Sequence, residues 1–212
     1  MCATRKLLGV WMAPTELEET MASIVGSKTE LNLLLAFAGE SQARNRYDFF
    51  SSKAKSDGYV QIAKLFRETA EQEKEHGERF FKFLEGGHAK ISAPFPAGEI
   101  LSTEENLLAA AAGEREEWEK AYAEFAKTAE GEGFSAIAAA FRAIAVAEKH
   151  HMERFTSMLE ELRRGTIFKK SDGIIWECLN CGYLHSGNGA PEICPACAHA
   201  KAYFARKRDC WH

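Results

Sequence analysis

The sequence predicts a mainly α protein in which a four-helix bundle is followed by a small cysteine-rich module. Four long stretches between residues 28 and 164 repeat apolar residues at helical spacing. The motif Glu73-x-x-His76 recurs 75 residues later as Glu148-x-x-His151, so two of these helices are near copies. Beyond residue 165, helical spacing gives way to glycine, proline, aromatic residues and two Cys-x-x-Cys pairs. We therefore expect three parts: an N-terminal extension (1–26), a helical bundle (27–165) and a small module (166–212).

The expected helices alternate with turn residues. A helix over residues 28–56 ends at Asp57-Gly58, a turn dipeptide, and a second helix runs to about residue 84, where two glycines stop it. Residues 88–101 contain two prolines and are expected to form an extended crossover. Ser102 then begins a third helix, with Glu105 at capping-box spacing. After a turn bracketed by two glycines, the fourth helix runs to about residue 164.

The two expected helical hairpins form an internal repeat with one irregularity. Residues of the second helix recur 75 positions later, whereas Gly39-Glu40 recurs as Gly113-Glu114, 74 positions later. The difference predicts an insertion of one residue in the second copy, between Glu114 and Phe134. Two helical hairpins joined by one long crossover are typical of the ferritin-like class of four-helix bundle.

Seven polar side chains fall in step with the apolar stripes of the four helices. They are Glu40, Glu73, His76, Glu114, Glu117, Glu148 and His151. Any one of them alone is more often a solvated or satisfied residue, but a carboxylate in an apolar core needs a compensating charge. One Glu from each of two helices and Glu-x-x-His from each of the other two form the ligand set of dinuclear carboxylate bundles. Oxygen-rich ligation with one imidazole per metal favours iron or manganese over zinc or copper.

The C-terminal cysteines predict a second metal site. Cys178, Cys181, Cys194 and Cys197 form two Cys-x-x-Cys pairs separated by twelve residues. Four thiolates can hold zinc or a single iron, and the pattern indicates metal binding in a reducing compartment rather than disulfides. A structural zinc ribbon is the alternative, although its gap is typically longer, about 15–20 residues. Cys-Gly-Tyr and Cys-Pro-x-Cys, with aromatic residues nearby, resemble rubredoxin, so we expect one iron that carries one electron.

The helical motifs resemble one family. Glu40-Ser-Gln-Ala-Arg-Asn-Arg-Tyr47, Glu73-Lys-Glu-His76, Gly113-Glu-Arg-Glu-Glu117 and Glu148-Lys-His-His151 are similar to the rubrerythrins, and the resemblance extends over residues 28–208. It implies that Glu73 and Glu148 bridge two irons, that Glu40 binds one of them, and that Glu114 and His151 bind the other. It also implies that Glu117 and His76 exchange on one iron, with the carboxylate bound when oxidised and the imidazole bound when reduced.

Two tyrosines, Tyr47 and Tyr122, match family tyrosines beside the metals, and by that resemblance they are candidate catalytic residues with Glu117 and His76. The alternative for each is an ordinary core aromatic residue whose hydroxyl is satisfied.

By this resemblance we expect a peroxidase that reduces hydrogen peroxide to water at two non-haem irons, in defence against oxidative stress. One iron in the four-cysteine site would return electrons from an NAD(P)H-dependent reductase, directly or through a separate rubredoxin. Glu117, released from iron after reduction, is the candidate acid and base. The resemblance also implies a homodimer in which the module of one subunit lies beside the bundle of another. A ferroxidase or iron-storage protein, and a structural bundle carrying a zinc ribbon, are the alternatives.

Composition and charge argue against binding to nucleic acid and against a membrane-spanning segment. The net charge is only −4 and both signs are mixed along the chain, so no nucleic-acid partner is expected. No apolar run approaches the roughly 18 residues of a membrane span. The apolar stretch over residues 7–13 barely reaches the roughly 7–15 residues that a signal peptide needs. We therefore interpret residues 1–26 as an extension and expect a cytoplasmic protein.

Overall fold

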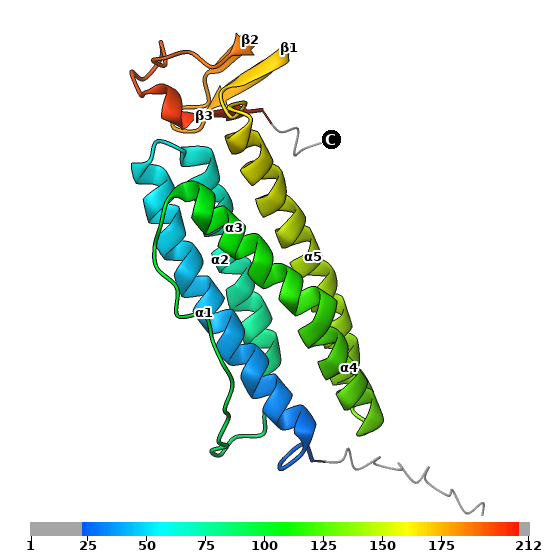
Figure 1. Cartoon of the computed structure of the whole chain (residues 1–212). Coiled ribbons are helices and arrows are strands. Elements are labelled where there is room, and N and C mark those ends of the chain that lie inside the picture. The colour runs from blue at the N-terminus through cyan, green and yellow to red at the C-terminus, as the bar shows by residue number, and fades with distance from the viewer. Residues whose placement is uncertain (1–22, 208–212) are drawn as a thin grey trace, which may run out of the picture.

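The computed structural model describes residues 23–207, and these form a helical bundle with a small sheet at one end (Figure 1). Most of the expected N-terminal extension lies outside the described residues. The elements, in chain order, are α1 (Lys28–Ser56), α2 (Val60–Phe81), α3 (Thr103–Glu116), η1 (Glu117–Ala121), α4 (Tyr122–Gly131), α5 (Ser135–Arg163), β1 (Lys169–Cys178), β2 (Leu184–Gly189), η2 (Lys201–Tyr203) and β3 (Phe204–Arg206). The expected fold class is confirmed.

Local chemistry explains where the helices begin and end. The Ser27 side chain accepts a hydrogen bond from Glu30 N at the start of α1, and Ser102 and Glu105 form the expected capping box before α3. Helix α2 ends at Phe81, three residues earlier than predicted. The chain leaves the helix through a tight turn in which Leu84 N donates to Phe81 O, and the two glycines that follow both have positive φ.

The third expected helix contains one π-helical turn, η1, between α3 and α4. Glu40 and Tyr47 are seven residues apart in the first hairpin, whereas Glu114 and Tyr122 are eight apart in the second. A π turn holds one more residue than an α turn, so it absorbs the extra position and returns Tyr122 to the buried face that carries Glu114. The π turn therefore lies where the repeat predicted an insertion.

Two apolar clusters lie on either side of a polar layer inside the bundle. One contains Tyr47, Phe50, Phe66, Leu107 and Phe155, and the other contains Leu33, Phe80, Tyr122, Phe141 and Ile144. Along each helix of the bundle, the Glu and His residues of the predicted site lie in sequence between residues of one cluster and residues of the other. Those polar side chains are consequently held between two well-packed blocks.

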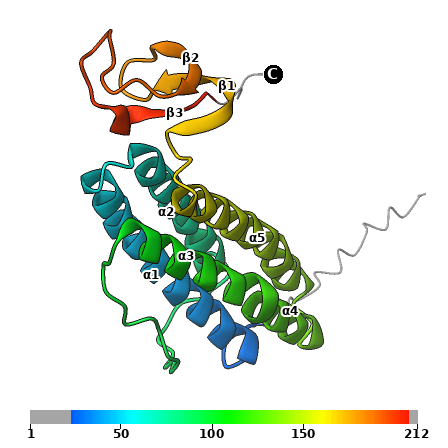
Figure 2. The same cartoon turned by 45° about the horizontal axis from the view of Figure 1, so that its top comes forward.

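The crossover between the hairpins, residues 88–101, is extended and largely exposed. It passes along the outside of α1, where Gln42 Nε2 donates to Pro96 O at 3.0 Å (Figures 1 and 2). None of the predicted metal ligands comes from it.

The C-terminal module is a three-stranded antiparallel sheet with strand order β2-β1-β3. Trp176 and Phe204 are fully buried in its small core. The module lies over the end of the bundle where α1 turns into α2 (Figure 2). Phe168 stacks on Tyr59 with ring centroids 6.1 Å apart, and Lys64 Nζ donates to Leu179 O at 3.3 Å.

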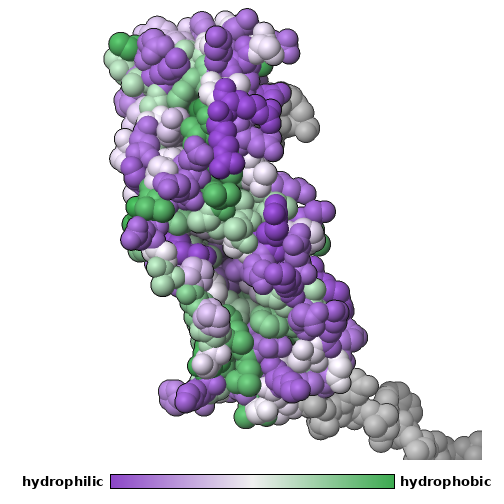
Figure 3. Space-filling model, viewed as in Figure 1, coloured by the Kyte–Doolittle hydropathy of each residue, from purple (hydrophilic) through white to green (hydrophobic). Residues whose placement is uncertain are grey.

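The surface in Figure 3 is mostly polar, with narrow apolar strips along the bundle. Over residues 23–207, none of the helices combines the length and the hydropathy that crossing a bilayer requires.

Candidate metal centres

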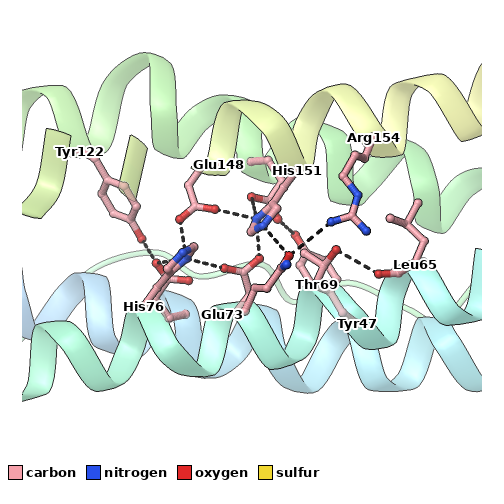
Figure 4. A network of polar contacts seen from close by, with 12 residues as sticks. Tyr47, Leu65, Thr69, Glu73, His76, Tyr122, Glu148, His151 and Arg154 are labelled. Carbon is pink, nitrogen blue, oxygen red and sulfur yellow. Dashed lines mark hydrogen bonds and ion pairs between the residues drawn. The ribbon is translucent and has the colours of Figure 1, made fainter. Parts of the chain in front are cut away.

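Six of the seven predicted bundle ligands meet in two overlapping groups (Figure 4). The first group contains Glu40, Glu73, His76 and Glu148, and the second contains Glu73, Glu114, Glu148 and His151. Within each group, one ligand-type atom from every residue lies within 4.8 Å of the others. Because both groups include Glu73 and Glu148, the geometry provides two adjacent cation positions joined by shared carboxylates.

Several buried polar atoms of this cluster have no hydrogen-bond partner. The buried atoms without a partner include Glu40 Oε2, Glu73 Oε1, Glu114 Oε2, both carboxylate oxygens of Glu148, and His151 Nδ1. His151 Nδ1 lies 2.8 Å from Glu148 Oε2, as in an ion pair, but the two are not aligned as a hydrogen bond. Leaving a buried polar group unsatisfied costs about 1–3 kcal/mol, and more for a charge. Divalent cations at the two positions would satisfy these atoms together.

In the absence of cations, protons must balance this charge. Burial and then the charge of Glu73 raise the pKa of Glu40 and of Glu114 well above the usual range. Burial opposes ionisation of Glu73, but the nearby His151 and His76, whose Nδ1 atoms lie 3.1 and 3.0 Å from its oxygens, outweigh burial and lower its pKa to about 2. Burial would lower the pKa of His76, yet Glu148 and Glu73 raise it to about 9. Metal binding would displace these protons.

Two buried tyrosines hold the terminal carboxylates. Tyr47 OH donates to Glu114 Oε1, and Tyr122 OH donates to Glu40 Oε1 at 2.5 Å. Each hydrogen bond joins one hairpin to the other. Tyr47 of the first hairpin binds a glutamate of the second, and Tyr122 of the second binds a glutamate of the first. Both tyrosines are therefore buried, and their hydroxyls bind glutamates of the cluster.

Glu117 is the predicted ligand that belongs to neither group. It opens the π turn and is only partly buried. A Cβ at Gly39 would lie 3.8 Å from Glu117 Oε1, so the glycine leaves this carboxylate room on the α1 side. Burial, and then the charges of Glu148 and Glu73, raise the pKa of Glu117 to about 8. His76 lies inside the first group while Glu117 stands apart from it.

Two polar neighbours of the cluster, Gln72 and Arg154, have no counterpart in the sequence prediction. Gln72 Oε1 lies 2.9 Å from His151 Nε2, and Arg154 Nη1 donates to the same Gln72 oxygen at 3.3 Å. An open cavity reaches the cluster here, and Gln72, Ala147, Arg154 and both motif histidines line it. No spacing rule distinguishes Gln72 or Arg154 from other polar residues on exposed helix faces.

The four cysteines form a separate compact group in the module. Cys178 Sγ is 3.7 Å from Cys197 Sγ, and Cys181 Sγ is 3.7 Å from Cys194 Sγ. These separations are much longer than the roughly 2.05 Å of a disulfide, and they suit four thiolates around one ion. Two tight turns shape the site: Gly182 N donates to Cys178 O at 2.8 Å, and Ala198 N donates to Cys194 O at 2.9 Å.

Comparison with known proteins decides the family. The family model described as Rubrerythrin matches residues 32–159, and the model of the rubredoxin-like domain of rubrerythrin matches residues 176–205. The chain belongs to the rubrerythrin family. It is 59% identical over 186 residues to a rubrerythrin of Porphyromonas gingivalis, and the alignment covers 88% of this chain and 93% of that relative. It is 54% identical over 184 residues to a rubrerythrin of Nitratidesulfovibrio vulgaris, covering 87% of this chain and 96% of that relative.

Solved structures agree with this family membership. A mixed-valence nigerythrin aligns with a TM-score of 0.59 and 31% identity, covering 98% of this chain and all of that chain. A Mycobacterium tuberculosis bacterioferritin aligns with a TM-score of 0.57 at 18% identity over 66% of this chain, and so shares the fold. This rubrerythrin-family protein is therefore an oxidoreductase with a di-iron carboxylate centre in the bundle and one iron in the rubredoxin-like four-cysteine site.

Proposed function

We propose that this protein is a peroxidase that reduces hydrogen peroxide to two molecules of water, taking up two electrons and two protons. The main observation in support is the pair of cation positions joined by Glu73 and Glu148, in the same chain as a four-cysteine site suited to electron transfer. An iron-storage protein needs no such return of electrons. When bound, the two irons supply the two electrons, and the residues around them position the reactants and protons.

We assign the ligands as follows. Glu73 and Glu148 would hold both irons, because within the described residues only these two belong to both groups. Glu40 and His76 complete one iron site, and Glu114 and His151 complete the other. By the family resemblance, Glu117 would replace His76 as a ligand when the irons are oxidised. In this structure, His76 lies inside the cluster and Glu117 lies outside it.

Side chains at the edge of the cluster are proposed to supply the protons that the reduction of peroxide consumes. Glu117 belongs to neither ligand group, and in the metal-free cluster its pKa is raised to about 8, so it holds a proton there near neutral pH. It is therefore the proposed proton donor, and His76 lines the open cavity that we propose as the entry route of peroxide. Tyr47 and Tyr122 hold Glu114 and Glu40 in place through their hydroxyls.

Electrons are proposed to come from an NAD(P)H-dependent reductase in the cytoplasm, directly or through a separate rubredoxin, and to enter at the four-cysteine iron. The module lies at the end of the bundle where α2 begins, and Glu73 is thirteen residues further along that helix. At 1.5 Å per residue, this corresponds to about 20 Å along the axis. A homodimer that places one subunit's module beside the other's bundle would shorten this path, and we propose that assembly.

Anaerobic turnover with stoichiometric iron tests the division of labour. Cys178→Ser is expected to retain the first reduction of peroxide by the reduced bundle but to lose steady-state turnover. Glu148→Ala is expected to lose both, because it removes a carboxylate shared by the two cation positions. Red absorption that is bleached by reductant and restored by peroxide supports the peroxidase. A colourless zinc protein, or oxidation of iron without peroxide turnover, would refute it.

A further inference from the structure

The two motif histidines have unequal surroundings although they occupy repeat-related positions. His151 Nε2 contacts Gln72 Oε1 at 2.9 Å, and the His151 side chain is 3% exposed. His76 faces the cluster through Nδ1, 2.8 Å from Glu148 Oε1, and its side chain is 15% exposed. Within residues 23–207, no hydrogen bond involves His76 Nε2. His151 therefore has polar contacts at both ring nitrogens, whereas His76 has them only at Nδ1.

Arg154 fixes the orientation of the Gln72 amide. A guanidinium can only donate, so the Gln72 atom that meets Arg154 Nη1 at 3.3 Å must be the oxygen. The same oxygen faces His151 Nε2, which must then carry the proton and donate it. When metal binding displaces the second proton of His151, its bare Nδ1 is directed at Glu73 and Glu148, as a metal ligand requires. Arg154 is itself anchored by Glu68 at 2.9 Å, and Figure 4 shows it beside His151.

The repeat supplies no such amide to His76. The residue 75 positions after Gln72 is Ala147, whose methyl group can neither donate nor accept a hydrogen bond. Gln72 and Ala147 each precede the glutamate of their motif, and both line the cavity that contains the two histidines. The repeat partner of Arg154 is Arg79, and its guanidinium lies over the Phe83 ring at 4.4 Å instead.

We propose that Gln72 is a positioning residue that fixes His151 as a permanent metal ligand, and that Ala147 leaves His76 untethered and makes it the exchangeable one. The first half concerns metal binding alone, whereas the second rests on the proposed exchange of His76 with Glu117. The difference between Gln72 and Ala147 thus determines which end of a nearly symmetric site changes its ligand.

The first test measures cobalt(II) binding to the metal-free full-length protein by visible absorption. Gln72→Ala is expected to weaken one of the two bundle cobalt sites by about 10–100-fold, the usual cost of losing such a partner of a metal-bound histidine. Gln72→Glu retains an oxygen acceptor and is expected to restore the affinity. Gln61→Ala is the matched control, because Gln61 lies on the same helix and contacts Met158 instead of a ligand. Parental affinity in Gln72→Ala, or no rescue by Gln72→Glu, would overturn the role of Gln72.

The second test compares crystal structures of the oxidised and reduced iron forms. Ala147→Gln places an amide beside His76, and we expect His76 to keep one position in both oxidation states of this variant. The parent protein is expected to show two positions. Exchange of His76 in Ala147→Gln as in the parent would refute the tethering argument. A fixed His76 in the parent would refute the exchange and the second half of the proposal, while the cobalt result would still decide the role of Gln72.

Discussion

Metal-free protein is expected to lose stability as the pH rises from 6 to 8. Glu117 has a pKa of about 8 in the folded chain against an ordinary value of 4.5, so the folded state binds more protons than the unfolded state over this range. Its contribution is complete below pH 4.5 and disappears as the pH rises through 8. His76, whose pKa is raised from 6.5 to about 9, acts in the same direction. At 1.36 kcal/mol per pH unit, and allowing for the partial exposure of Glu117, the loss is about 1–3 kcal/mol.

Thermal unfolding followed by circular dichroism measures this loss. A change of that size should lower the Tm of the metal-free bundle by about 3–10 °C between pH 6 and pH 8. The iron-loaded protein should change little, because cations replace the protons. Glu117→Gln, which cannot ionise, should show a smaller decline when metal-free. A metal-free Tm that stays constant or rises over this range would refute the electrostatic account of the cluster.

Three further outcomes are expected. Tyr122→Phe should destabilise the metal-free protein by about 1–3 kcal/mol in urea unfolding, because Glu40 loses its buried donor. Deletion of the exposed Glu119 should convert η1 to regular helix, leaving the Tm unchanged or higher but lowering peroxide turnover; loss of folding would contradict the one-residue insertion. Ala198→Gly should stabilise the module by roughly 1 kcal/mol, measured by thermal bleaching of the four-cysteine iron, because residue 198 has a φ of +57°.

Much of the fold follows from short-range rules in the sequence. Apolar spacing and the capping residues Ser27 and Ser102 define the helices, and the 75-residue repeat pairs them into hairpins. The offset of 74 even locates the extra residue between Glu114 and Phe134. The repeat alone does not predict whether the extra residue is absorbed by a wider helical turn or by a longer loop. The chain forms a π turn because this conformation keeps Tyr122 on the buried face, and that preference depends on packing across the bundle.

The ligand cluster was also largely predictable, because helical phase places six of its members on one interior surface. The position of Glu117 was not, since sequence defines the face of a helix but not the rotamer of a side chain near its edge. The roles of Gln72 and Arg154 could not be predicted from the sequence for a related reason. Their contacts with His151 join different helices, and only the assembled bundle brings them within hydrogen-bonding distance.

Each cation position draws its ligands from both hairpins, while the crossover between them contributes none. Bound ions would therefore link the two hairpins, whose covalent connection, residues 88–101, could be cut without removing any of these Glu and His residues. Two co-expressed fragments severed there are expected to copurify when loaded with iron and to separate under a chelator.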